Sequence, residues 1–257
     1  MKHELLAIYT LWLRELKRFY RQKSRIFGMI MQPLLFLFLI GTGLANSLAA
    51  SAGFDYLEFM YPGIICMTLL FTSVFSGLSI VRDREFGFLK EVMVAPISRI
   101  SIALGKTFGG SSVAVLQGTL LLLLSPIVGI SLSLGIVVKL ILLMLLIAFS
   151  LTSMGILIAV PMESMEGFQM IMNFLIMPMF FLSGAFFPMK GLPTWMNSLM
   201  KINPLSYAVD ALRNVIFTGQ EAALMVNYSL SFDITILLTI GIILNILAMA
   251  VFQMKKQ

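Results

Sequence analysis

The most constraining feature of this 257-residue chain is a set of six long runs that contain no Asp, Glu, Lys or Arg. They cover residues 26–54, 59–81, 107–138, 140–162, 167–189 and 234–254. A helix needs about 20 apolar residues to cross the hydrocarbon core of a bilayer, and each run is longer than that. We therefore predict a polytopic membrane protein, because a soluble domain has no use for six such segments.

Composition favours the same class of protein. Hydrophobic residues make up 59% of the chain and charged residues 12%, whereas ordinary globular domains carry about 25% charged residues to cover their core. The length allows one compact bundle with short connections and no sizeable soluble domain. Cys66 is the only cysteine and lies inside an apolar run, which excludes intrachain disulfides and cysteine-based metal sites.

We expect an all-α integral membrane protein with six transmembrane helices. The spans are placed approximately at 26–46, 59–81, 107–127, 139–160, 167–188 and 232–254, in one transmembrane domain that covers residues 26–255. Pro33 is expected to kink the first span, which is tolerable where neighbouring helices satisfy the freed backbone groups.

The distribution of positive charge predicts the orientation. Fourteen of the 18 Lys and Arg residues lie in the N-terminal tail, the segment 82–106 and the C-terminal tail. By the positive-inside rule, both termini and the loop after the second span are cytoplasmic. The positive charge thus indicates membrane orientation and not a nucleic-acid partner, and the expected location is the cell (inner or plasma) membrane.

Residues 1–25 have the pattern of an amphipathic helix that lies in the membrane interface. One side carries Leu5, Ile8, Tyr9, Trp12, Leu13, Leu16, Phe19 and Tyr20, and the other carries Arg14, Lys17, Arg18 and Arg21. Leu11 is the exception on the basic side. We expect the aromatic rings to face lipid and the cations to face anionic headgroups. A solvated basic tail is the alternative, but the apolar side is too continuous for it.

The cytoplasmic segment 81–96 has the pattern of a short amphipathic helix that ends at Pro96. Phe86, Leu89, Val92 and Met93 share one face, and Gly87, Lys90 and Glu91 lie opposite. One interpretation is a surface helix that rests on the membrane. The other is a helix that inserts mixed charges and a few apolar side chains into the groove of a cytosolic partner. The high charge density between nearly charge-free spans favours the partner.

The last outer segment predicts two short helices. Asn203 is suited to cap a helix and Pro204 to occupy its first position. Asp210 and Arg213 are spaced to pair at i,i+3 on a polar face with Ser206. The opposite, apolar face holds Leu205, Ala208, Val209, Leu212 and Ile216. With a preceding helical stretch at 192–200, we expect outer re-entrant helices before the last span, and an ordinary outer loop is the alternative.

Two motifs carry a family resemblance. The cytoplasmic motif is Arg-Glu-Phe-Gly-Phe-Leu-Lys-Glu…Ala-Pro-Ile-Ser-Arg (84–99), and the outer motif is Asn-Pro-Leu-Ser-Tyr-Ala-Val-Asp-Ala-Leu-Arg (203–213). In their order among the spans, they resemble the membrane subunit of an ABC type-2 exporter, nearest the drug-efflux and nodulation-factor-export permeases. The resemblance covers nearly the whole chain. Many relatives carry Thr at Phe88 and Thr-Pro at Ala95-Pro96, which leaves the class intact.

The resemblance implies a permease that moves a lipophilic or amphipathic substrate (a drug, lipid or glycoconjugate) with ATP hydrolysed by a separate subunit. It implies two copies of a cytosolic ABC ATPase, which bind ATP and Mg, and a second permease subunit, expected to form a homodimer. The implied coupling residues are Arg84, Glu85, Phe86, Gly87, Leu89, Lys90, Glu91 and Pro96. The implied outer re-entrant motif contains Asn203, Pro204, Tyr207, Asp210 and Arg213.

We predict that the chain is not an enzyme and holds no cofactor. Gly105-Lys106-Thr107 resembles the end of a phosphate-binding P-loop, but the earlier glycine would fall at Ile100 and no strand precedes it. His3 is the only histidine and lies in the N-terminal tail. The spans contain no His, Asp and Glu cluster that would serve a metal site or a proton relay.

The main alternative function is an ion-driven secondary carrier or a channel without an ATPase partner. Such carriers place ionisable groups near the midplane and use symmetric broken helices. This sequence has neither pattern, so the exporter subunit is the better interpretation. A structural or assembly scaffold without transport is a third interpretation.

Overall fold

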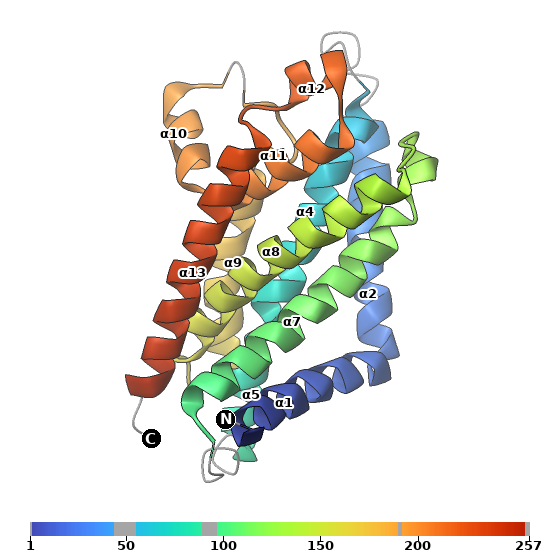
Figure 1. Ribbon diagram of the computed structural model, residues 1–257. Coiled ribbons are helices and arrows are strands. Elements are labelled where there is room, and N and C mark those ends of the chain that lie inside the picture. Colours follow the sequence, from blue (N-terminus) through green and yellow to red (C-terminus); the bar gives the residue numbers. More distant parts are fainter. Residues whose placement is uncertain (1, 44–54, 89–96, 190–191, 255–257) are drawn as a thin grey trace.

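The computed structural model describes residues 2–43, 55–88, 97–189 and 192–254, which form helices and turns with no strand in these ranges (Figure 1). The first elements are α1 (Lys2–Arg21), α2 (Lys23–Leu35), the π-helical turn η1 (Phe36–Ile40), α4 (Tyr56–Ser76) and α5 (Leu78–Glu85). They are followed by α7 (Arg99–Leu122), the 3-10 turn η2 (Ser125–Val128), α8 (Leu134–Ala159) and α9 (Met165–Phe181). The last elements are α10 (Thr194–Ile202), α11 (Pro204–Ile216), α12 (Gly219–Met225) and α13 (Leu230–Met254).

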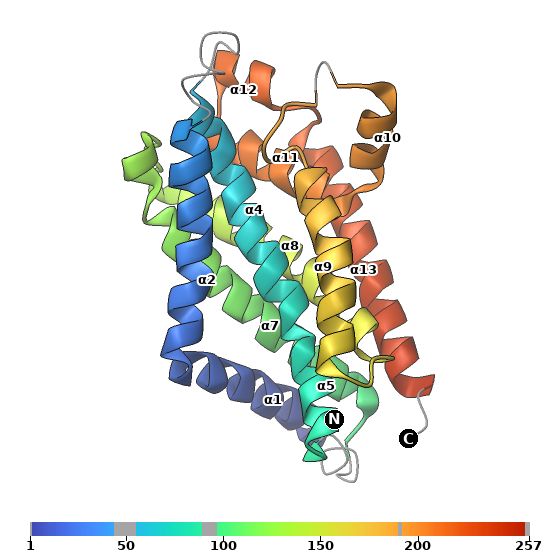
Figure 2. The ribbon, with the colours of Figure 1, turned by 180° about the vertical axis from the view of Figure 1, so that it is seen from behind.

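Six of the described helices form one bundle, and further helices cross its two ends. In Figure 1, α2, α4, α7, α8, α9 and α13 run between the two ends, and α1 crosses one end beside both termini. The helices α10, α11 and α12 lie at the opposite end. Figure 2 shows from behind that α1 meets the bundle close to α5 and the lower part of α2.

Four helices in the described part are long and apolar enough to cross a membrane: Ile26–Gly43, Tyr56–Glu85, Leu134–Ala159 and Leu230–Met254. They coincide with four of the six predicted spans. The other two predicted spans correspond to α7, which carries Arg99 and Lys106, and to α9, a shorter apolar helix. Helix α8 ends at Ala159 and α9 begins at Met165, so residues 160–164 form the connection between them.

In three places the helix boundaries differ from the predicted ones. The third long helix begins at Arg99 and not at residue 107, because the Ser98 hydroxyl caps it by accepting a hydrogen bond from the Ser101 N–H at 3.1 Å. The fifth ends at Phe181 and not at 188, and the chain then turns with Gly184 at a φ of 77°. The predicted helix at 81–96 is interrupted after Glu85, where Gly87 adopts a left-handed φ of 76°.

The first helix lies against α7 through small residues. A Cβ atom on Gly105 would lie 2.8 Å from the Leu11 Cβ, and a Cβ on Gly109 would lie 2.8 Å from the Glu15 Cβ. These glycines are four residues apart, so they share one face of α7 and let α1 approach closely. Leu11, the exception in the predicted amphipathic pattern, is buried in this contact, while Tyr9 and Tyr20 remain exposed.

A second close approach joins α8 to the junction of α4 and α5. The Gly155 Cβ position lies 2.5 Å from the Val74 carbonyl oxygen, and Gly77 in turn lies against the Gly155 backbone. Glycine at positions 77 and 155 leaves room for the two backbones to approach this closely.

Candidate functional site

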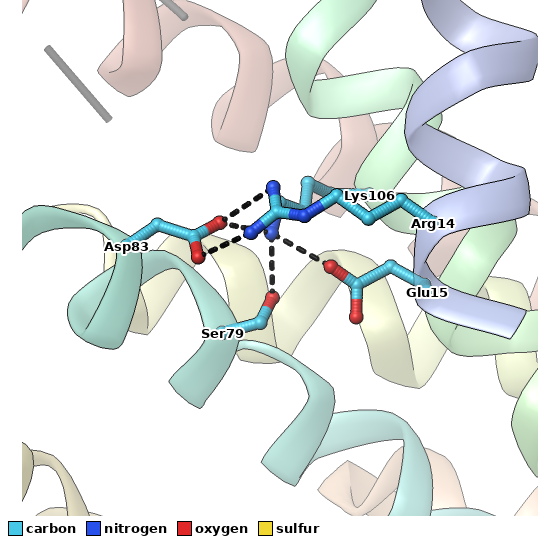
Figure 3. A network of polar contacts seen from close by, with 5 residues as sticks. All are labelled: Arg14, Glu15, Ser79, Asp83 and Lys106. Atoms are coloured by element: carbon cyan, nitrogen blue, oxygen red, sulfur yellow. Dashed lines mark hydrogen bonds and ion pairs between the residues drawn. The ribbon is translucent and has the colours of Figure 1, made fainter. Parts of the chain in front are cut away.

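A polar cluster joins α1, α5 and α7 at the end of the bundle that carries the termini (Figure 3). The Lys106 ammonium lies 2.6 Å from Asp83 Oδ2 and 2.8 Å from Glu15 Oε1, and it donates to the Ser79 hydroxyl at 3.0 Å. Arg14 reaches Asp83 from the other side with two hydrogen bonds of 2.7 and 3.2 Å. We call these five residues the α1–α7 cluster.

The α1–α7 cluster is largely sealed from solvent. The side chains of Lys106, Asp83 and Glu15 are 3%, 6% and 13% exposed. Desolvation of isolated charges is costly, so each buried charge needs partners. Here one ammonium is shared by two carboxylates, and one of those carboxylates also binds an arginine. The sequence prediction placed Lys106 in a cytoplasmic loop and missed this cluster.

Helix α1 contacts the chain on both sides of the segment 89–96, the part of the predicted coupling segment that lies outside the described residues. Before this segment, the Arg14 guanidinium lies 4.0 Å above the Phe88 ring. After it, the Glu4 carboxylate accepts hydrogen bonds from the Ser98 N–H and hydroxyl at 2.9–3.0 Å and from the Ser101 hydroxyl at 2.5 Å. The hydrogen bonds from Ser101 and Ser98 lower the pKa of Glu4. Helix α1 thus holds both flanks of residues 89–96.

Arg84 connects the coupling segment to the turn between α8 and α9. Its guanidinium donates to the Val160 carbonyl at 2.8 Å and to the Met162 carbonyl. The last carbonyls of a helix have no partner within the helix, and a cation at that end also suits the helix dipole. Arg84 therefore links α5 directly to the end of α8.

Replacing Arg84 with Met should lower the free energy of unfolding by about 1–3 kcal/mol, because two charge-assisted hydrogen bonds to backbone carbonyls are lost. The measurement is the thermal unfolding midpoint of the purified protein in detergent. The exposed Arg21 at the end of α1 provides the matched control, and Arg21→Met should leave the midpoint nearly unchanged. Equal midpoints for the two variants would contradict the role of Arg84.

The other predicted coupling residues divide into two groups. Glu85 and Phe86 are exposed, and Phe86 is 74% accessible at the point where α5 ends. Gly87 supplies the left-handed turn that follows. Leu89, Lys90, Glu91 and Pro96 lie outside the described residues.

At the opposite end, Asn203 joins α9 to α11. Its side-chain oxygen accepts from the Leu205 N–H at 3.0 Å, and its amide donates to the carbonyls of Met179 and Leu182 at 2.6 and 2.9 Å. Pro204 occupies the first position of α11. The predicted cap and helix start are confirmed, and the same side chain also satisfies the free carbonyls at the end of α9.

The predicted i,i+3 ion pair between Asp210 and Arg213 is not formed. The Asp210 carboxylate accepts from the N–H groups of Asn227 and Tyr228 at 2.8–3.1 Å and so holds the chain just before α13. The buried Arg213 guanidinium donates to the carbonyls of Gly184 and Phe59 at 2.8 and 3.2 Å and lies 3.8 Å above the Phe59 ring. Each charge therefore binds a different neighbouring segment.

Burial changes the acidity of both groups. It raises the pKa of Asp210 in spite of the hydrogen bonds from Tyr228 and Asn227. It lowers the pKa of Arg213 to about 10, so that Arg213 remains charged at neutral pH.

Both predicted faces of α11 are buried, because Ser206, Asp210 and Arg213 on the polar face are as inaccessible as the residues of the apolar face. Tyr207 donates its hydroxyl to the Lys201 carbonyl at 2.6 Å and fixes α10 to α11. Among the described residues, no three His, Cys, Asp or Glu side chains come together to hold a metal ion. The side chains of both polar regions bind neighbouring helices and so connect them.

Comparisons with known proteins place this bundle in a transporter family. Residues 6–217 match the family described as ABC-2 type transporter. The chain is 32% identical over 198 residues to ycf38 of Cyanophora paradoxa, which is named as a transport permease, and the match covers 75% of this chain and 68% of the relative. It is 25% identical over 215 residues to the inner membrane transport permease YadH of Escherichia coli strain K12, covering 80% and 81%.

A third relative is YbhR of the same E. coli strain, named as a multidrug ABC transporter permease. It is 29% identical over 168 residues, which is 63% of this chain and 44% of YbhR. The chain belongs to the ABC-2 type transporter family. Together with its apolar helices, this membership makes it an integral membrane protein of the transport permease class.

Proposed function

We propose that this chain is the membrane subunit of an ATP-driven exporter and moves a lipophilic or amphipathic substrate with ATP hydrolysed by a separate subunit. The family membership supports the transport role. The name of YbhR supports a drug-like substrate and an ABC ATPase partner. We propose a pair of these permeases, as a homodimer, with two ATPase copies beneath it.

The observation that carries the proposal is that α1 contacts the residues that precede and follow the segment 89–96 in the sequence. The elements before and after this segment are both fastened to α1 by charged contacts. Arg84 extends the connection to the end of α8. A force that an ATPase applies to residues 89–96 would move α1, α5, α7 and the end of α8 as one unit, a rigid-body transition of the kind that gates transport pathways.

We propose that the end with both termini is cytoplasmic and that the protein resides in the cell membrane. The excess of Lys and Arg at that end supports this orientation. In this topology α7 and α9 complete six spans, and α10 and α11 are the outer re-entrant helices. Residues Arg84 to Glu91 with Pro96 are then the contact segment for the ATPase.

The test is reconstitution of the chain with its ATPase subunit in proteoliposomes, with vanadate-sensitive substrate movement as the readout. Glu85→Ala and Leu89→Ala should each reduce transport per ATP hydrolysed by about ten-fold, a size typical of coupling between sites. The bundle should stay folded, because Glu85 is exposed. Lys139→Ala, at the exposed start of α8, is the matched control and should transport normally.

Normal transport by both variants at normal expression would contradict the coupling role. Vanadate-insensitive transport driven by a proton or sodium gradient would instead support the secondary carrier. Labelling that placed residue 90 on the outer side of the membrane would contradict the topology and the ATPase contact together.

A further inference from the structure

A cavity of about 220 Å³ lies where α1 crosses α4, α5 and α7, next to the α1–α7 cluster. Its charged lining consists of Arg18 and Glu15 of α1 and Arg82 of α5. Its apolar lining includes Phe19, Phe75, Leu78 and Val113. Most of these side chains are half-buried, so the cavity opens at the protein surface.

The cations around this cavity outnumber the carboxylates. Both nearby carboxylates, Glu15 and Asp83, form their ion pairs with Lys106 and Arg14. Within the described residues, Arg18 and Arg82 have no ion pair or hydrogen bond of their own. Asp83 and Glu15 attract Arg82, but Arg18 lies close enough to repel it. Both guanidinium groups therefore line the cavity, and neither forms an ion pair with a carboxylate of the described residues.

The chemistry of the lining selects an amphipathic anion. Guanidinium groups bind phosphate oxygens in a bidentate fashion, with planar geometry that a lysine cannot match. The phenylalanine rings and aliphatic side chains in the same lining favour a hydrocarbon chain over water. Exposed Leu5, Tyr9 and Tyr20 on α1 are typical of a helix at the membrane interface, where phospholipid headgroups are abundant.

We propose that this cavity is a binding site for the phosphate headgroup of an anionic membrane lipid. The phosphate lies between Arg18 and Arg82, and the first part of an acyl chain lies against Phe75 and Val113. The bound lipid fastens α1 to α4 and α5. This site goes beyond the proposed transport function, because it requires neither ATP nor a transported substrate.

The test uses the full-length chain in neutral detergent, with any ATPase subunit that remains bound. Binding of phosphatidylglycerol, phosphatidylcholine with the same acyl chains, and glycerol 3-phosphate is measured by thermal shift and native mass spectrometry. Phosphatidylglycerol should bind tightest. Arg18→Gln and Arg82→Gln should each weaken its binding about five-fold. Without lipid, Arg18→Gln should unfold no earlier than wild type, because Arg18 repels Arg82.

The matched control is Lys17→Gln, which removes one positive charge from an exposed position of α1 outside the cavity. It should retain the wild-type preference for phosphatidylglycerol. An equal loss in Lys17→Gln, or no loss in the arginine variants, would overturn the proposal. Glycerol 3-phosphate binding as tightly as the lipid would assign the site to a soluble phosphate. The comparison of the three ligands on wild type decides this even if a variant does not fold.

Discussion

Replacing Lys106 with Met should lower the free energy of unfolding by about 3–5 kcal/mol, the cost of leaving a buried charge without its partner. The substitution preserves the length of the side chain but removes the ammonium that forms ion pairs with both Asp83 and Glu15. Asp83 keeps its ion pair with Arg14, whereas Glu15 loses its ion pair with Lys106. Thermal or denaturant unfolding of the purified protein in mixed micelles measures the loss.

Two further variants separate charge pairing from packing at this position. Lys139→Met removes an exposed lysine from α8 and should change stability by no more than about 0.5 kcal/mol. Adding Glu15→Gln to Lys106→Met should recover part of the loss, because it neutralises the carboxylate that was left unpaired. A double variant that is no more stable than Lys106→Met would attribute the loss to packing and not to charge.

Gly155→Ala should destabilise the bundle by about 3 kcal/mol, at the upper end of the range for overpacked interiors. The added methyl group would lie 2.5 Å from the carbonyl oxygen and 2.8 Å from the Cα of Val74. Both are backbone atoms, so no rotation of a side chain relieves the overlap. Helices α4 and α8 must therefore move apart. The destabilisation is measured as a lower yield and a lower unfolding midpoint of the purified variant.

The same helix supplies the control. A Cβ on Gly135, in the first turn of α8, meets no atom within 4 Å. Gly135→Ala should therefore stabilise the protein by about 0.5–1 kcal/mol, since alanine loses less backbone entropy than glycine on folding. If the Gly155→Ala variant were as stable as the Gly135→Ala variant, the result would contradict the close backbone contact between α4 and α8.

Local patterns in the sequence predicted much of the fold. The charge-free runs correspond to long helices because a membrane helix must satisfy its backbone internally and present apolar side chains to lipid. Asn203 and Pro204 marked the start of α11 because capping depends only on adjacent residues. The cytoplasmic and outer motifs were sufficient to indicate the family, to which the chain does belong.

The same local rules misplaced the charged residues. Lys106 was assigned to a loop because a charge normally marks the edge of a span. Its partners Asp83 and Glu15 are 23 and 91 residues away in the chain, so no local pattern indicates them. Arg213 was paired with Asp210 by helix spacing, whereas it binds the Phe59 carbonyl, 154 residues away. Glycines 105 and 109 offered a signal for a close helix contact, but not the identity of the partner helix.

The sequence by itself thus determined the class of the protein, the approximate position of its long helices and the capped start of α11, since these depend on hydrophobicity and on neighbouring residues. Only the tertiary structure decided which charges are buried, which partners neutralise them and which glycines let helices touch. The physical reason is that a buried polar group is stable only when a partner lies within hydrogen-bonding distance. In this protein those partners come from helices that the chain brings together only when the bundle forms.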